Sequence, residues 1–271
     1  MIVALTFDID CQTYTDGAAQ SMPDELNVAM RALGPVFDRH PEWRATWFLR
    51  IDPALDMFTR QRQLLRGLVD AGHGIGWHYH GPIKKIAEFA RVARRRGLDL
   101  SRVGFGRGSN QIMRVLAGAG FRIDSTAMPR PTYPWTRRGV DWTTTPEEPY
   151  RPSVADYRVP GSPSVPILEV PMSCTEVSAP GDNQQVVRYM NPAYRPEIFR
   201  KSLQAWLGRH RQLVTITHPY EVCTGPSHGL LAFDVAAFEA NVMTIEKLTG
   251  GCEFRTLDDV PQQQPLEIAS A

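Results

Sequence analysis

The chain has 271 residues, and its 42% hydrophobic content is enough for a packed core and argues against a disordered protein. Thirty basic residues against 29 acidic ones leave a net charge of +1, so no overall field would attract nucleic acid or an anionic membrane. No apolar run approaches the roughly 18 residues that a membrane-spanning helix requires. We therefore expect neither nucleic acid nor a membrane as a partner.

The N-terminal run MIVALTF has no basic region and no cleavage site, so it is predicted to be a strand rather than an export signal. This predicts a cytoplasmic protein. The cysteines are scattered and form no C-x-x-C pair, which predicts free thiols rather than a disulfide framework. They are Cys11, Cys174, Cys223 and Cys252.

Short β-rich runs alternate with longer stretches of helical spacing through most of the chain, a pattern typical of βα units. In chain order, the pattern predicts a strand at 2–8, a helix after the capping residues 21–24, a strand at 44–49, a helix at 61–70, a strand at 74–80, a helix at 83–96, a strand at 102–105, a helix at 110–119, strands at 121–125 and 167–172, a helix at 196–207, a strand at 213–217, a helix at 233–248 and a strand at 253–257.

No glycine-rich phosphate loop follows the first strand, so this alternation favours a (β/α) barrel over a doubly wound sheet. We expect an α/β fold with seven or eight barrel strands, in one catalytic domain that spans residues 1–271. Residues 128–166 are rich in proline, threonine and arginine and show no sustained period. We expect this stretch to be an irregular excursion that lies over or near the site.

Polar residues at the carboxyl ends of barrel strands are the first candidates for a site. The first strand ends in Asp8, Ile9 and Asp10. Side chains alternate across a strand, so both carboxylates can enter one pocket. Capping of the next turn is an equally good interpretation of these two residues.

Two histidines follow the same rule at the end of the third strand, where His78 and His80 project from one face. Neutral imidazole is a common ligand of zinc and related metals. Together with Asp10, the pair would supply three protein ligands and leave a position open, which is typical of a catalytic metal site.

The remaining histidines carry weaker signals. His218 ends the apolar strand at 213–217, which is little evidence taken alone. We expect His40 and His210 to be solvated near helix ends and His73 to lie in a turn, whereas His228 could be structural or functional.

The order of these clusters resembles the polysaccharide deacetylase family, also known as the NodB-homology family or carbohydrate esterase family 4. The matching segments are 6–10 (the T-F-D-D motif), 72–78 (G-H-E-I-G-N-H), 102–106 (R-x-P-Y-G), 116–125, 167–171 and the His218 strand. The resemblance implies a distorted (β/α)7–8 barrel that holds one divalent metal and hydrolyses an N-acyl group on an amino sugar.

Carried over residue by residue, the resemblance implies Asp8 as general base, with Arg102 orienting it, and His218 as general acid. Asp10, His78 and His80 would be the metal ligands, and the metal is expected to be zinc, with nickel, cobalt or iron as alternatives. The groups expected to contact the substrate are the backbone N–H near Phe105 and the side chains of Trp77 and Arg50.

Three departures from the family pattern matter. Ile9 separates the two acids, as in the branch that deformylates lipid-linked aminoarabinose. The common H-x-x-x-H spacing would place the third ligand at Pro82, which leaves His80 as the only nearby candidate. Gly104 replaces the motif proline, and we expect it to loosen its loop and widen the site.

The expected function is a metal-dependent N-deacetylase acting on a small molecule that contains an N-acylated amino sugar, such as a natural-product intermediate. The excursion could form a lid whose aromatic residues stack on sugar rings, although packing onto the barrel is as good an interpretation; these residues are Tyr133, Trp135, Trp142 and Tyr150. A deformylase, amidase or esterase on the same metal site is an alternative, and so is a catalytically silent sugar-binding protein. The chain has no G-x-S-x-G elbow, which argues against a serine hydrolase.

Overall fold

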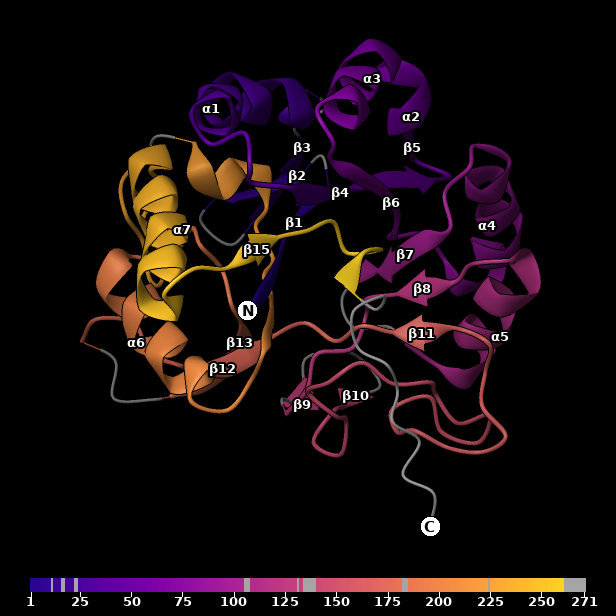
Figure 1. The fold of residues 1–271 in the computed structure, drawn as a ribbon. Coiled ribbons are helices and arrows are strands. Elements are labelled where there is room, and N and C mark those ends of the chain that lie inside the picture. The colour runs from indigo at the N-terminus through magenta and orange to yellow at the C-terminus, as the bar shows by residue number, and fades with distance from the viewer. Residues whose placement is uncertain are drawn as a thin grey trace.

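The computed structural model describes residues 1–10, 12–15, 18–21, 24–104, 108–130, 132–133, 140–181, 185–223 and 225–260. Within these residues a nine-stranded, mostly parallel sheet forms the centre of the molecule (Figure 1). Its main path runs in the order β11 (Leu168–Glu169), β8 (Ile123–Asp124), β7 (Leu100–Val103), β6 (Gly74–Tyr79), β4 (Ala45–Asp52), β1 (Ile2–Ile9) and β14 (Gln212–Val214). Off this path, β15 (Glu253–Phe254) pairs with β1, and β5 (Leu55–Asp56) pairs with β4.

Helices cover the outer face of this sheet. They are α1 (Glu25–Arg39), α2 (Met57–Arg60), α3 (Arg62–Asp70), α4 (Ile86–Arg95), α5 (Asn110–Ala119), α6 (Pro196–Leu207) and α7 (Val235–Thr249), with short 3-10 turns η1 (Ile83–Lys85) and η3 (Pro219–Val222). The predicted bounds of α5 and α6 are confirmed. Local signals mark the two ends of α5: the Ser109 hydroxyl accepts a bond from the Ile112 N–H, and Gly120 ends the helix with a φ of 91°.

Strand alternation divides the core into an outer and an inner part. Val3, Leu5 and Phe7 of β1 pack outward with α1, α6 and α7, and the Phe7 ring stacks on Trp47 at 4.3 Å. Ala4 faces inward and packs with residues such as Phe48 in a smaller apolar cluster. Both faces of these strands are covered, which explains why they read as nearly continuous hydrophobic runs.

The expected α/β class is confirmed, but the sheet is a curled half-barrel and does not close into the expected distorted (β/α)7–8 barrel. No strand ladder joins β11 to β14 in the described part of the chain. Beyond β11 the chain instead forms the antiparallel hairpin of β12 (Cys174–Val177) and β13 (Val186–Tyr189), which the sequence analysis missed. Between β14 and the segments next to this hairpin there are isolated backbone hydrogen bonds, in which Ser173 N donates to Val214 O at 3.0 Å and Ile216 N donates to Met190 O at 2.9 Å. A second unpredicted hairpin pairs β2 (Gln12–Thr15) with β3 (Ala18–Ser21).

The excursion at 128–166 contains the short pair β9 (Thr132–Tyr133) and β10 (Val140–Asp141). It packs beside α5 and β11, where Asn110 Oδ1 accepts a bond from Tyr157 N at 2.7 Å and Tyr150 bridges to Glu169. Trp142 and Tyr150 are buried in this packing, so they are not available for sugar stacking, while the side chains of Tyr133 and Trp135 lie outside the described residues. The contacts of the excursion therefore give no support for a lid.

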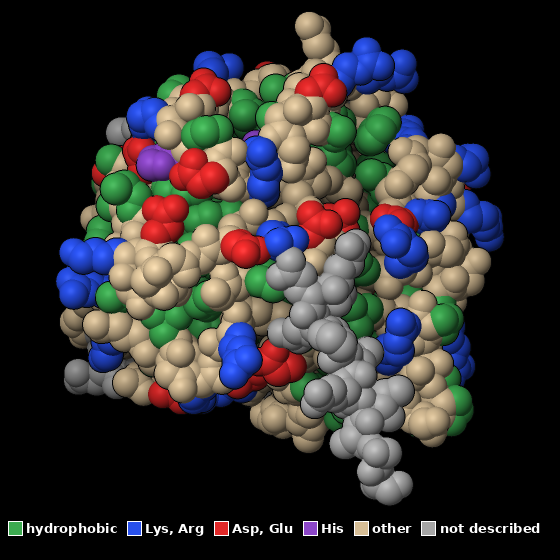
Figure 2. All heavy atoms as spheres, viewed as in Figure 1, with side chains coloured by type: hydrophobic (Ala, Val, Ile, Leu, Met, Phe, Trp, Pro, Cys, Tyr) green, Lys and Arg blue, Asp and Glu red, His purple; other side chains and the backbone are tan. Residues whose placement is uncertain are grey.

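The face seen in Figure 2 carries both basic and acidic side chains, with hydrophobic groups between them. None of the helices in the described ranges combines the length and apolarity needed to cross a bilayer. Cys174, Cys223 and Cys252 are free thiols, and Cys11 lies outside the described residues.

Candidate metal centre

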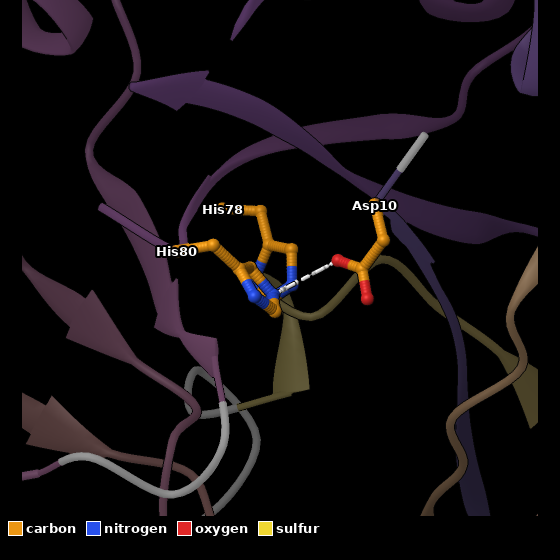
Figure 3. A group of neighbouring side chains, drawn as sticks. All are labelled: Asp10, His78 and His80. Atoms are coloured by element: carbon orange, nitrogen blue, oxygen red, sulfur yellow. Dashed lines mark hydrogen bonds and ion pairs between the residues drawn. The ribbon is translucent and has the colours of Figure 1, made fainter. Parts of the chain in front are cut away.

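Three ligand atoms from the ends of β1 and β6, which lie on either side of β4 in the sheet, converge on one point (Figure 3). Asp10 directly follows β1, His78 lies in β6, and His80 follows the end of β6. Asp10 Oδ1 lies 2.8 Å from His78 Nε2 and 2.9 Å from His80 Nε2, and the two Nε2 atoms are 2.7 Å apart. The structure thus brings together the three residues named from the alternation of the strands.

The donor set fits a divalent cation. The His78 Nδ1 lies 2.9 Å from the Arg102 carbonyl oxygen, and a carbonyl can only accept. Nδ1 therefore carries the proton and leaves the lone pair of Nε2 directed at the cluster. Asp10 Oδ1 is buried and faces the Nε2 atoms of both histidines. Two imidazole nitrogens and one carboxylate oxygen are an established ligand combination for zinc and similar metals.

The charges of the cluster also favour a divalent cation. Burial opposes ionisation of Asp10, yet His78 and His80 hold its pKa well below the usual value. Burial also lowers the pKa of His78, but Asp8 and Asp10 outweigh it and raise that pKa overall. The buried carboxylates thus favour a positive charge at the site. A divalent cation would supply that charge in place of the proton on His78 Nε2.

Asp8 lies beside the cluster and is paired with a buried arginine. Arg102 Nη1 donates to Asp8 Oδ1 at 2.7 Å and to Thr6 Oγ1 at 2.8 Å. Burial would raise the pKa of Asp8, but Arg102 and then His78 lower it overall, so the carboxylate stays ionised. Asp8 Oδ2 lies 3.9 Å from His78 Nε2, which is outside direct hydrogen-bonding range and leaves this oxygen free to accept a proton.

Arg102 is itself held on every side. Its Nε donates to Ser125 O at 2.8 Å and its Nη2 to Ser125 Oγ at 2.9 Å. Its guanidinium also lies 4.1 Å from the centroid of the Phe48 ring. These contacts orient the guanidinium towards Asp8.

His218 follows the carboxyl end of β14 and lies beside the cluster. Its Nε2 lies 3.7 Å from Asp10 Oδ2, and its Nδ1 lies 3.2 Å from Glu221 Oε1. Burial lowers the pKa of His218, but Glu221 outweighs it and raises the pKa to about 10. His218 is therefore a protonated imidazole that could donate a proton.

The sequence analysis missed Glu221 as a partner of His218. Its Oε2 accepts from His218 N at 2.8 Å and from Asn191 Nδ2 at 2.8 Å, so the carboxylate is fixed from two directions. The spacing H-x-x-E is that of a capping box at the start of η3, which could have revealed the pair. Tyr189 of the missed hairpin is also close, with its ring 6.3 Å from that of His218.

The three residues expected to contact the substrate, Trp77, Arg50 and Phe105, have different positions in the structure. Trp77 is fully buried and donates to Ile51 O at 2.9 Å, because it projects from the face of β6 opposite His78; its expected role is wrong. Arg50 lies at the site, where its Nη1 donates to Asp10 O at 2.9 Å and its Nε to Asp52 Oδ2 at 2.5 Å. Arg50 therefore holds the backbone of Asp10, a proposed metal ligand, in place. Phe105 lies outside the described residues.

Several other expectations are corrected. Gly104 does not widen the site, because the His80 ring occupies the space that a side chain at position 104 would fill. His40 and His210 are not simply solvated, since each stacks on a tryptophan, at 3.9 Å on Trp43 and 3.7 Å on Trp206. His73 is buried and accepts from Ala45 N at 3.1 Å, and burial lowers its pKa to about 4.

Comparisons with known proteins add little to this geometry. No protein-family model matches the chain, and no curated protein matches it. One similar solved structure is that of a Bordetella bronchiseptica protein assigned as a polysaccharide deacetylase involved in O-antigen biosynthesis, at 16% sequence identity and a TM-score of 0.36. The similarity covers 62% of this chain and 56% of that protein, so the chain matches little more than half of its length.

Proposed function

We propose that the chain is a metal-dependent hydrolase that removes an N-acyl group from a small molecule containing an amino sugar. The observation that carries the proposal is the arrangement of three groups around one point. An ionised carboxylate, Asp8, and a protonated imidazole, His218, both lie within 4 Å of an atom of the three-ligand cluster. A general base and a general acid beside a Lewis acid suit hydrolysis of an amide.

A divalent cation held by Asp10, His78 and His80 would supply Lewis acidity at the acyl carbonyl. Asp8, kept ionised by Arg102, takes a proton from the attacking water as the oxygen bonds to the carbonyl carbon. His218 donates its proton to the nitrogen as the carbon–nitrogen bond breaks. The products are a carboxylic acid and a free amine. Each proton transfer is worth roughly 10²–10⁴ in rate.

The ligand set supports zinc as the metal, because two imidazoles and one carboxylate with an open position are a common catalytic zinc site. The same donors also suit nickel, cobalt or iron. The bases and ligands are almost fully enclosed, with exposed fractions of 5% for Asp8, 4% for Asp10 and 1% for His78. This enclosure favours a substrate whose acyl group can reach inward, such as a monosaccharide or short conjugate.

The test combines metal analysis with a substrate panel. The purified protein is analysed for bound metals, then incubated with N-acetylated monosaccharides, pseudo-disaccharides and a chitin oligomer series, with and without a chelator. The proposal expects acetate from the small substrates that stops with the chelator and returns with zinc. Activity that rises steadily with oligomer length would restore a polymer substrate. Release of formate from N-formyl analogues would identify a deformylase, and metal binding without turnover of any substrate would identify a binding protein.

A further inference from the structure

We propose that Gly104 is part of the metal site, because the absence of a side chain there is what allows His80 to serve as the third ligand. The inference rests on the proposed function, since it assigns a positioning residue to the same metal. It concerns the packing of one ligand ring against one backbone position.

The geometry starts from the pairing of β6 with β7. These strands run parallel, with Tyr79 opposite Val103, so His80 and Gly104 follow side by side at the two strand ends. A Cβ added at Gly104 would lie 2.2 Å from His80 Nε2, 2.5 Å from Cε1 and 2.7 Å from Cδ2. All three of its closest neighbours are therefore atoms of one imidazole, and the nearest is the ligand nitrogen.

Backbone conformation does not explain this glycine. Seven described glycines have a positive φ, the region in which glycine is favoured, and Gly104 is not among them. An L-residue could adopt the backbone of position 104 without strain. The space that a side chain would need is taken by the His80 ring.

The ring has little room to move aside and remain a ligand. The His78 ring lies 4.4 Å away on one side, and only 8% of the His80 side chain is exposed. Beyond His80 the turn is constrained, because the Tyr79 hydroxyl donates to Pro82 O at 2.7 Å and a Cβ at Gly81 would lie 2.6 Å from that hydroxyl oxygen.

The size of the clash sets the expected effect. Ordinary van der Waals contact begins at 3.4 Å, so an alanine at position 104 would displace the imidazole by about 1 Å. Metal–ligand distances tolerate only about 0.2 Å. Gly104→Ala should therefore weaken metal binding as much as loss of a supporting contact does, by roughly 10–100-fold or more.

The experiment measures zinc binding to the metal-free full chain by calorimetry and records the cobalt absorption spectrum, which reports the number of ligands. The variants are Gly104→Ala, His80→Ala and the double variant. Gly118→Ala in α5 is the matched control, since no atom lies within 4 Å of a Cβ built there. We expect Gly118→Ala to bind like wild type, Gly104→Ala to bind at least tenfold more weakly with an altered cobalt spectrum, and the double variant to bind no more weakly than His80→Ala.

Unfolding of the metal-free variants separates this inference from the proposed function. Gly104→Ala should lower stability in the wild-type background but not in the His80→Ala background, where the clashing ring is absent. Equal zinc affinity of Gly104→Ala and wild type would overturn the inference while leaving the metal site intact. If wild type binds no metal, the proposed function fails. In that case a stability loss that persists without His80 would overturn the packing relation as well.

Discussion

Two pairs of buried carboxyl groups lie in the same half-barrel, and their pKa values are shifted in opposite directions. Asp8 and Asp10 end the β1 segment, and the second pair, Asp124 and Glu169, lies opposite each other on β8 and β11. All four are at most 5% exposed. Burial and residue type are therefore shared, and only the neighbours differ.

Cationic neighbours surround the first pair. In spite of burial, Arg102 and then His78 lower the pKa of Asp8, and His78 and His80 lower that of Asp10. The second pair has no such cluster. Burial raises the pKa of both Asp124 and Glu169, most strongly that of Glu169, whose pKa the charge of Asp124 raises further. The environment of this pair therefore favours protonation, whereas that of the first pair favours ionisation.

The pair with raised pKa values supports the ionised pair through the backbone. Glu169 Oε1 accepts from Thr126 N at 3.0 Å and from Ala127 N at 2.8 Å. The adjoining Ser125 holds the guanidinium of Arg102, which in turn holds Asp8. One carboxyl pair thus suits chemistry and the other suits scaffolding, and their neighbours account for the difference.

Replacing Asp8 by asparagine should produce the largest change in activity. The proposed base is removed while the three ligands stay in place, so kcat/KM should fall by roughly 10²–10⁴-fold with metal content unchanged. Steady-state kinetics and metal analysis of the same preparation test this. His228→Ala, in an exposed loop position, is the control. Near wild-type turnover by the metal-loaded Asp8→Asn protein would remove Asp8 from the mechanism.

Arg102→Met should break the ion pair between Arg102 and Asp8 by removing its cation. It leaves the buried carboxylate of Asp8 without its cation, and such a loss costs about 3–5 kcal/mol in free energy of unfolding. Denaturant unfolding at neutral pH measures the cost, and the exposed Arg95→Met variant controls for loss of a surface charge. Lowering the pH should narrow the difference between Arg102→Met and wild type, because protonation of Asp8 removes the unpaired charge. A difference that is the same at every pH would place the effect in packing.

Glu221→Gln should change the pH dependence of activity. The charge of Glu221 helps raise the pKa of His218 to about 10, so its removal lowers that pKa and moves the alkaline limb of the kcat/KM profile to lower pH. Above the new pKa, activity should fall about tenfold per pH unit, because the protonated fraction of the acid does so. An unmoved alkaline limb would show that another group donates the proton.

Glu169→Gln should have the smallest effect, under about 1 kcal/mol near pH 5, because an amide resembles the protonated acid that is present at that pH. A folded-state pKa above the unfolded value of about 4.3 means that wild-type stability is full below that pH and is lost as pH rises towards the folded pKa. Unfolding measured from pH 5 to pH 9 should therefore show wild type losing stability relative to Glu169→Gln. Glu169→Ala, which leaves the N–H groups of Thr126 and Ala127 without their acceptor, should be clearly less stable at every pH. Parallel curves for wild type and Glu169→Gln would mean that the pair is ionised.

Local patterns in the sequence were sufficient for a large part of the site. The i, i+2 spacing of Asp8 with Asp10 and of His78 with His80 placed each pair on one face, because side chains alternate along any strand. The ends of α5 and α6 followed from capping signals and from proline at a helix start, which act within one helical turn. These features need no knowledge of distant contacts.

Contacts between residues far apart in the chain decided the rest. Asp124 and Glu169 are 45 residues apart in sequence, and whether their carboxyl groups share a proton depends on the register of β8 with β11. The fit of His80 against Gly104 depends on the pairing of β6 with β7, and the open edge of the barrel depends on a hairpin that pairs with itself. The sequence by itself determined which residues could act as ligand, base and acid, because residue type and strand alternation are local. The tertiary structure alone decided their charge states, their supports and the shape of the sheet, because burial and neighbouring charges exist only after the chain has folded.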